Sequence, residues 1–216
     1  MDLLIWDLDG TLIDSRRDIA HCVNWTLQDM DLAPIPHEHI YRYVGHGVRA
    51  LIQGAVEEAH GHDYNSAMKI FDSHYRAHLL DHTRLYAGMS EVLDYYGDKK
   101  MAIITNKPQH YTDPIIEGLQ IGSYFEAILG REACEQMKPH PQPLLKVMDM
   151  LSVREERTVM IGDTEIDIEA GKRAGVQTCG VLFGFGQQDT VRMAEPDYLV
   201  EQVTELKSVF TNEPKA

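Results

Sequence analysis

Two carboxylates lie one residue apart at the end of the first apolar segment of the chain. Residues 3–6 form an apolar run that is typical of a buried strand, and Asp7 and Asp9 come next. Because side chains alternate along a strand, both carboxylates leave the same face if the strand geometry continues. Gly10 then permits a sharp turn that brings the backbone close to a ligand.

Two like charges at this spacing repel each other, so a cation, a shared proton or open solvent must offset the repulsion. A hard divalent metal fits, because carboxylates and backbone carbonyls are ligands that suit magnesium. The alternative is a solvated turn after a strand, for which Asp-x-Asp-Gly is an ordinary sequence. The elements that must position these residues decide between the two interpretations.

From residue 85 onward, short apolar runs that predict strands alternate with amphipathic segments that predict helices. The predicted elements are strands at 100–106, 127–130, 158–162, 177–182 and 198–200, and helices that include 144–151 and 166–174. This alternation predicts an α/β fold with a Rossmann-like core, in which helices cover both faces of a parallel sheet. Ligands bind beyond the carboxyl ends of the strands in such folds.

Polar residues follow two of these strands at the ends where a ligand is expected. The Thr105 hydroxyl and the backbone N–H groups from Asn106 onward suit a phosphoryl oxygen, although a helix cap is an equally good use of them. Asp163 ends a later strand, where it can reach a metal ion. Asp167 lies in the first turn of the next helix, where the helix dipole favours an acid whether or not it supports a metal site.

Lys138 precedes Pro139 in a segment that contains three alternating prolines. A residue before proline is held extended, and the prolines stiffen the approach to the next helix. A flexible cation on such a rigid loop can neutralise a carboxylate and a phosphate together. A lone lysine is otherwise an ordinary solvated charge.

The long segment after the first carboxylates contains no convincing strand. Residues 15–18 resemble a capping box, and a helical apolar stripe follows until Pro34 and Pro36 end it. Helical patterns then continue to residue 82, and a helical block of this length predicts an inserted all-helical domain. The expected bounds are 15–85 for the helical domain, and 1–14 with 86–216 for the core.

Histidine and cysteine offer no better metal site. His74, His78 and His82 recur at every fourth position, but no His-Glu-x-x-His pattern accompanies them, so a solvated or domain-facing stripe is the better interpretation. The three cysteines are far apart and lack CxxC spacing, which argues against a disulfide framework. We therefore expect a reduced compartment, the cytoplasm.

Size, composition and charge limit the function classes. A chain of 216 residues fits one large domain or a core with an insertion, and contents of 44% hydrophobic and 25% charged residues are globular values. The net charge of −14 argues against nucleic acid or an anionic membrane as a partner. We expect neither a membrane span nor a signal peptide, because acidic residues interrupt the N-terminal apolar region.

Four segments resemble the motifs of the haloacid dehalogenase superfamily, and they occur in family order. These segments are 7–12, 104–106, 138–139 and 162–167. The helical block corresponds to the cap domain that this family carries after its first motif. The resemblance implies that Asp7 is a nucleophile that forms an aspartyl-phosphate, and that Asp9 is first the general acid and then the base.

The resemblance also implies a cofactor, Mg²⁺, and a phosphate-binding group. The implied metal ligands are Asp7, the carbonyl of Asp9 and Asp163, with Asp167 in support. The implied phosphate-binding residues are Thr105, Asn106 and Lys138. The charges agree with this assignment, because a dianionic phosphate cannot approach an acidic nucleophile without neutralising partners.

Asp9 itself favours phosphoryl chemistry within the superfamily, because a halide leaving group needs no acid and an alkoxide does. The first and second motifs, with residues 43–49 and 83–88, look most like those of phosphoglycolate phosphatases, although Leu85 and Ala87 replace common prolines. His46 or Arg49 in the cap can meet a small carboxylate as the cap closes, or can be solvated cap residues.

The sequence thus predicts a magnesium-dependent phosphatase that acts on a small phosphorylated metabolite, with 2-phosphoglycolate as the expected ester. A pyrophosphatase, a nucleotidase and a sugar-phosphate phosphatase or mutase of the same superfamily are the enzymatic alternatives. A non-catalytic binding protein would require a broken motif, and none is broken. Monomer and homodimer both remain open.

Overall fold

The computed structural model describes residues 1–210, which contain a six-stranded parallel sheet in the order β5-β4-β1-β6-β7-β8. The strands are β1 Leu3–Trp6, β4 Lys100–Ile104, β5 Ala127–Leu129, β6 Thr158–Gly162, β7 Gln177–Val181 and β8 Tyr198–Val200. The predicted α/β fold is confirmed, with each predicted strand of the sheet in place. Because β1 lies between β4 and β6, the residue after β1 stands at the centre of the carboxyl edge.

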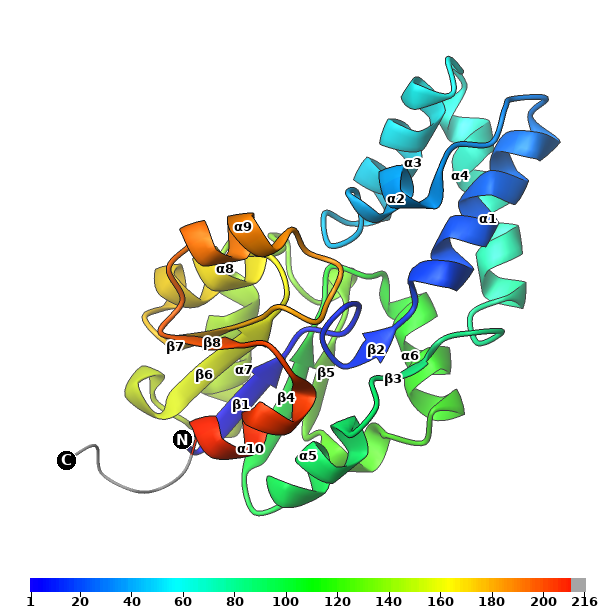
Figure 1. The fold of residues 1–216 in the computed structure, drawn as a ribbon. Coiled ribbons are helices and arrows are strands. Elements are labelled where there is room, and N and C mark those ends of the chain that lie inside the picture. The colour runs from blue at the N-terminus through cyan, green and yellow to red at the C-terminus, as the bar shows by residue number, and fades with distance from the viewer. Residues whose placement is uncertain (211–216) are drawn as a thin grey trace.

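Helices cover both faces of this sheet (Figure 1). Alternate residues of β1 divide between the faces, so that Leu3 and Ile5 pack beside α7 and α8, and Leu4 and Trp6 pack beside α5, α6 and α10. The helices of the core are α5 Met89–Tyr95, α6 Gln109–Gly118, α7 Gln142–Leu151, α8 Glu165–Ala174, α9 Gln188–Met193 and α10 Leu206–Val209. Short 3₁₀ turns occur at Gly122–Tyr124, Arg131–Ala133, Glu155–Arg157 and Val203–Glu205.

Four further helices lie together to one side of the sheet, where α4 packs on α1 and α3 (Figure 1). They are α1 Arg16–Asp29, α2 His37–Tyr41, α3 Val48–Glu58 and α4 Tyr64–Ala77. The chain leaves the core at β2 (Ile13–Asp14) and returns at β3 (Arg84–Leu85), which pair antiparallel. The sequence did not predict this pair, because two residues are too few to show an alternating pattern.

The expected capping box at the start of α1 is wrong. The N-cap residue Ser15 makes no capping bond, because its hydroxyl donates to Asp9, and the Asp18 carboxylate accepts from the backbone N–H groups of His82 and Thr83. The helix also ends before the prolines, where Asp31 adopts a left-handed φ of 58°. Tertiary hydrogen bonds therefore use the side chains that the local pattern assigned to the helix end.

The histidine stripe packs where α1 meets α4. Each of its three members lies 2.8 Å from a carboxylate, in the pairs His74–Asp29, His78–Asp81 and His82–Asp18. The only cluster of potential metal ligands within residues 1–210 is formed by carboxylates elsewhere. All three cysteines are free thiols, and no helix in this part of the chain is long and apolar enough to cross a bilayer.

Candidate active site

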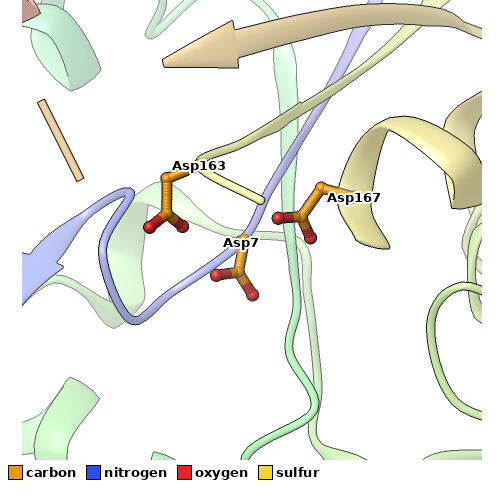
Figure 2. A group of neighbouring side chains, drawn as sticks. All are labelled: Asp7, Asp163 and Asp167. Carbon is orange, nitrogen blue, oxygen red and sulfur yellow. The ribbon is translucent and has the colours of Figure 1, made fainter. Parts of the chain in front are cut away.

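Three buried carboxylates converge at the carboxyl edge of the sheet (Figure 2). Asp7 follows β1, Asp163 follows β6, and Asp167 lies in the first turn of α8. The parallel register of β1 and β6 brings the two strand ends together. One oxygen from each carboxylate lies within 4.8 Å of the other two, so the predicted strand-end residues do meet.

Lys138 reaches this carboxylate cluster from the proline-rich loop. Its Nζ lies 2.7 Å from Asp7 Oδ1 and 2.7 Å from Asp167 Oδ1, and the residue is only 2% exposed. Burial alone would lower the pKa of Lys138, but the charges of Asp167 and Asp7 outweigh it and raise this pKa. The lysine is therefore a fixed positive charge inside the site and not a solvated one.

Asp167 makes contacts at the start of α8 and also with Lys138. Its Oδ2 accepts from the Thr164 backbone N–H at 3.1 Å and from the Thr164 hydroxyl at 2.7 Å, which forms a capping box at the start of α8. Its Oδ1 faces Lys138. A Cβ at Gly162 would overlap this carboxylate, so the end of β6 requires glycine there.

Asp163 is held by a loop that sequence reasoning missed. The backbone N–H groups of Phe185 and Gly186 donate to its Oδ2 at 2.8 and 3.0 Å, and the Thr11 hydroxyl donates to its Oδ1 at 3.2 Å. Gly10 adopts a φ of +87°, and a Cβ there would overlap Asp163. The Phe-Gly-Phe-Gly sequence after β7 could have indicated this loop, because alternating glycines permit its backbone to lie close to Asp163.

The carboxylate cluster carries more negative than positive charge. Burial raises the pKa of Asp7 above its ordinary value, the charges of Asp167 and Asp163 raise it further, and Lys138 opposes them. Burial, with the charge of Asp167, raises the pKa of Asp163 to about 7 against its hydrogen bonds. The three carboxylates have a single ammonium among them, which contacts Asp7 and Asp167, and a divalent cation that prefers oxygen ligands would offset the excess. The donor chemistry of these residues therefore fits Mg²⁺.

The carboxylate of Asp9 points to a different set of partners, although it is only two residues from Asp7. The Lys107 ammonium lies 3.0 and 2.9 Å from its two oxygens, and the Ser15 hydroxyl donates to the same group. The third bond of Lys107 goes to the Tyr75 hydroxyl of α4, at 2.7 Å. The Asp9 carbonyl oxygen accepts no hydrogen bond within residues 1–210, so it is available to a metal ion.

Lys107 is a second residue that sequence reasoning missed. It is 8% exposed and follows the predicted phosphate-binding residues at the end of β4, so the strand-end rule that singled out its neighbours applied to it as well. The Thr105 hydroxyl accepts from the Lys107 backbone N–H at 3.1 Å and caps no helix, because α6 begins at Gln109. The Asn106 amide donates at 3.0 Å to the carbonyls of both Gly45 and Lys138.

A cavity of about 50 Å³ lies between the sheet and the four helices. Asp7, Asp9, Thr105 and Lys107 line it from the core. The helical wall is mainly apolar and includes Ile19, Val44, Leu51, Phe71 and Tyr75. Asp7 of the carboxylate cluster and the Asp9–Lys107 pair thus border the same cavity.

His46 and Arg49 do not line this cavity. The Arg49 guanidinium lies 5.5 Å from the centre of the Tyr64 ring, and His46 borders a separate hollow beside Thr164 and Phe185. The structure therefore brings together the predicted core residues and leaves these two cap residues apart from them.

Comparison with known proteins agrees with this fold and site. The family model of the haloacid dehalogenase-like hydrolases matches residues 4–181. Phosphoglycolate phosphatase of Aquifex aeolicus is 32% identical over 214 residues and covers 98% of each chain, and that of Colwellia psychrerythraea is 35% identical and covers 95% of each. A crystal structure of a predicted phosphoglycolate phosphatase from Haemophilus somnus superposes with a TM-score of 0.92 at 25% identity, over 98% of each chain.

The chain belongs to the haloacid dehalogenase-like hydrolases, as its motifs predicted. Within that family it is a phosphatase that acts on phosphate monoesters.

Proposed function

We propose that this phosphatase hydrolyses 2-phosphoglycolate through an aspartyl-phosphate on Asp7, with Mg²⁺ as cofactor. The main observation that supports this proposal is the position of Asp7. It lies at the centre of the carboxyl edge of the sheet, contacts Lys138 and borders the same cavity as Asp9. A nucleophile, a neutralising cation and a second carboxylate are the parts that phosphoryl transfer to an acid requires. Relatives that carry the name phosphoglycolate phosphatase over nearly the full chain support the choice of ester.

The reaction has two steps, the formation and the hydrolysis of the aspartyl-phosphate. In the first, an Asp7 oxygen attacks phosphorus, the ester P–O bond breaks, and the leaving alkoxide takes a proton from Asp9. In the second, a water oxygen attacks phosphorus, Asp9 accepts the proton of that water, and the bond from Asp7 to phosphorus breaks. Inorganic phosphate is released, Asp7 is again a free carboxylate, and Asp9 again carries the proton with which it began.

The proposed metal ligands are Asp7, the carbonyl of Asp9 and Asp163, with Asp167 in support. When bound, Mg²⁺ supplies positive charge against the phosphoryl oxygens and the buried carboxylates. Lys138 supplies the second positive charge from its position against Asp7. The Thr105 hydroxyl, the backbone at Asn106 and Lys138 would bind the remaining phosphoryl oxygens.

The helical segment would act as a cap that excludes water from this reaction. We propose bounds of 15–85 for the cap, and 1–14 with 86–216 for the core. The specificity role of His46 and Arg49 then requires a movement of the cap around the start of α3, because neither residue lines the cavity as the structure stands. The natural partner would be a small phosphorylated metabolite of the cytoplasm, since the net charge of −14 argues against nucleic acid or an anionic membrane as the partner.

Phosphate release from a panel of esters tests the proposal. The panel contains 2-phosphoglycolate, pyrophosphate, nucleoside monophosphates and hexose phosphates, each with Mg²⁺ and with chelator. We expect magnesium-dependent preference for 2-phosphoglycolate, which Asp7→Asn abolishes. Asp2→Asn is the matched control, because it makes the same change at the far end of the same strand, where Asp2 pairs with Arg157. Full activity of Asp7→Asn would contradict the mechanism, and preference for another ester would contradict the substrate.

A further inference from the structure

Lys107 is the one cation among the residues that line the cavity in the described part of the chain. Its ammonium is bonded to Asp9, the residue proposed to protonate the ester oxygen. The atoms that follow the ester oxygen in a substrate must therefore lie beside Lys107. When Asp9 carries the proton that it gives to the ester oxygen, the charge of Lys107 is left to pair with a leaving group that is itself negative.

Tyr75 adds a hydrogen-bond donor from the opposite wall. Its oxygen accepts from Lys107, and its own proton has no acceptor within residues 1–210. The side chain is buried, at 2% exposure, and burial holds the pKa of Tyr75 well above its usual value, so that the phenol keeps its proton. A phenol of this kind borders the cavity with a proton to donate.

We propose that Lys107 and Tyr75 form a subsite for a carboxylate on the leaving group of the phosphate monoester. This inference rests on the proposed function and names the part of the substrate that the site recognises. A carboxylate offers two acceptor oxygens and a negative charge, which match one O–H donor and one ammonium. The rest of the wall is apolar, so the hydroxyl groups of a sugar would lose their hydrogen bonds to water without replacement there.

Lys107 can serve this ligand without releasing Asp9. Its three protons are directed to the two Asp9 oxygens and to the Tyr75 oxygen. A substrate carboxylate that takes over one of the two bonds to Asp9 leaves Asp9 with the other, and with the bond from Ser15. The subsite and the acid thus share one cation, which places the carboxylate close to the ester bond that breaks.

The subsite is complete only when the helices lie on the core. Tyr75 belongs to α4, whereas Lys107 belongs to the loop after β4. An ester with a carboxylate on its leaving group therefore binds the closed arrangement through one more hydrogen bond than an ester without it. This differential contact stabilises closure with the correct substrate.

The test compares two esters that differ only in the charged end, 2-phosphoglycolate and 2-hydroxyethyl phosphate. We expect Tyr75→Phe to lower the ratio of their kcat/KM values, 2-phosphoglycolate over 2-hydroxyethyl phosphate, by about tenfold or more, because a hydrogen bond to a charged group is lost. The change should lie mainly in KM. Lys107→Met should lower the same ratio further and slow both esters, because Lys107 also holds Asp9.

Tyr96→Phe is the matched control, since it removes another buried hydroxyl, one that donates to the Leu206 carbonyl away from the cavity. An unchanged ratio in Tyr75→Phe, with wild-type turnover of 2-phosphoglycolate intact, would overturn the subsite and leave the proposed function in place. The same two esters are also titrated calorimetrically into the Asp7→Asn protein, which makes the test independent of turnover. Equal affinity for both esters would overturn the subsite even if the proposed reaction failed.

Discussion

The two charged groups of the site are built in different ways. The carboxylate cluster and Lys138 come from two strand ends, a loop and the first turn of α8 in the core, and their contacts are complete within it. The group around Asp9 combines Lys107 of the core with Ser15 at the base of α1 and Tyr75 on α4. The sheet fixes the first group, whereas the second is complete only while the helices lie on the core.

The same two groups differ in charge. The carboxylate cluster has one ammonium for three carboxylates and calls for a further cation. The Asp9 group has one ammonium for one carboxylate, and its unused donor is the Tyr75 proton. The carboxylate cluster is therefore suited to a metal ion, and the group around Asp9 is suited to an organic substrate.

The largest effect is expected where the carboxylate cluster loses the ammonium of Lys138. Lys138→Met should lower kcat by about 10³-fold, because it removes a fixed charge from the phosphoryl group. It should also lower the free energy of unfolding by about 3–5 kcal/mol, since Asp7 and Asp167 stay buried without their partner. Initial rates and urea unfolding measure the two effects.

A second substitution separates these two effects. Lys138→Met combined with Asp167→Asn removes one of the unpaired charges, so part of the lost stability should return while activity stays low. If the double variant is no more stable than the single one, the buried charges are not the cause of the loss.

A smaller effect is expected where the Asp9 group loses one hydrogen bond. Ser15→Ala should lower kcat by about tenfold, because Asp9 loses a donor that helps to orient it. The measurement is steady-state turnover of 2-phosphoglycolate. Ser208→Ala is the control, because its hydroxyl donates to the Glu205 carbonyl on the surface. Equal turnover in Ser15→Ala and wild type would show that this contact has no part in catalysis.

The contacts that join α1 to the segment after α4 should depend on pH. Burial alone would raise the pKa of Asp18, but hydrogen bonds from His82 and Thr83 outweigh it and hold this pKa below its usual value. A lowered pKa stabilises the folded protein above the unfolded value of about 4, and this contribution is lost as pH falls through the folded pKa. Asp18→Asn should therefore cost about 1–3 kcal/mol at pH 7.

The difference in unfolding free energy between Asp18→Asn and wild type should shrink as the pH falls below about 4, where the wild-type carboxyl also becomes neutral. Urea unfolding over a pH series measures it, with Asp2→Asn as the exposed-carboxylate control. A difference that stays constant over the whole series would show that the charge of Asp18 does not carry the effect.

The smallest effects are expected at His46 and Arg49, before and within the first turn of α3. His46→Gln and Arg49→Gln should each change kcat/KM for 2-phosphoglycolate by less than about threefold, which corresponds to about 0.7 kcal/mol, because neither side chain lines the cavity. A rise in KM of tenfold or more would show that these residues reach the substrate during closure.

The core half of the site could be predicted from sequence because its signals are local. Asp7 and Asp163 follow apolar runs, and parallel pairing of β1 with β6 brings them together without further information. The Asp9 half depends on contacts between distant residues. Lys107 and Asp9 are 98 positions apart, and Tyr75 meets Lys107 only because α4 docks on the core. Helical periodicity predicts that α4 forms, but not where it docks.

The two capping boxes illustrate the same limit. The box at Thr164 and Asp167 forms, because α8 begins directly at the strand end that places both residues. The box expected at Ser15 and Asp18 does not, because both side chains have stronger partners in other elements. A local pattern predicts which side chains can cap a helix, and the tertiary structure decides which of them do.

Calorimetric titration of Mg²⁺ tests most directly whether the metal ion binds to the carboxylate cluster and not to the group around Asp9. Wild type, Asp163→Asn and Lys107→Met are compared at one pH and one ionic strength. We expect that Asp163→Asn loses most of its Mg²⁺ affinity and that Lys107→Met keeps its affinity within about threefold of wild type. An equal loss of Mg²⁺ affinity in the two variants, or an unchanged affinity in Asp163→Asn, would contradict the assignment of the metal ion to the carboxylate cluster.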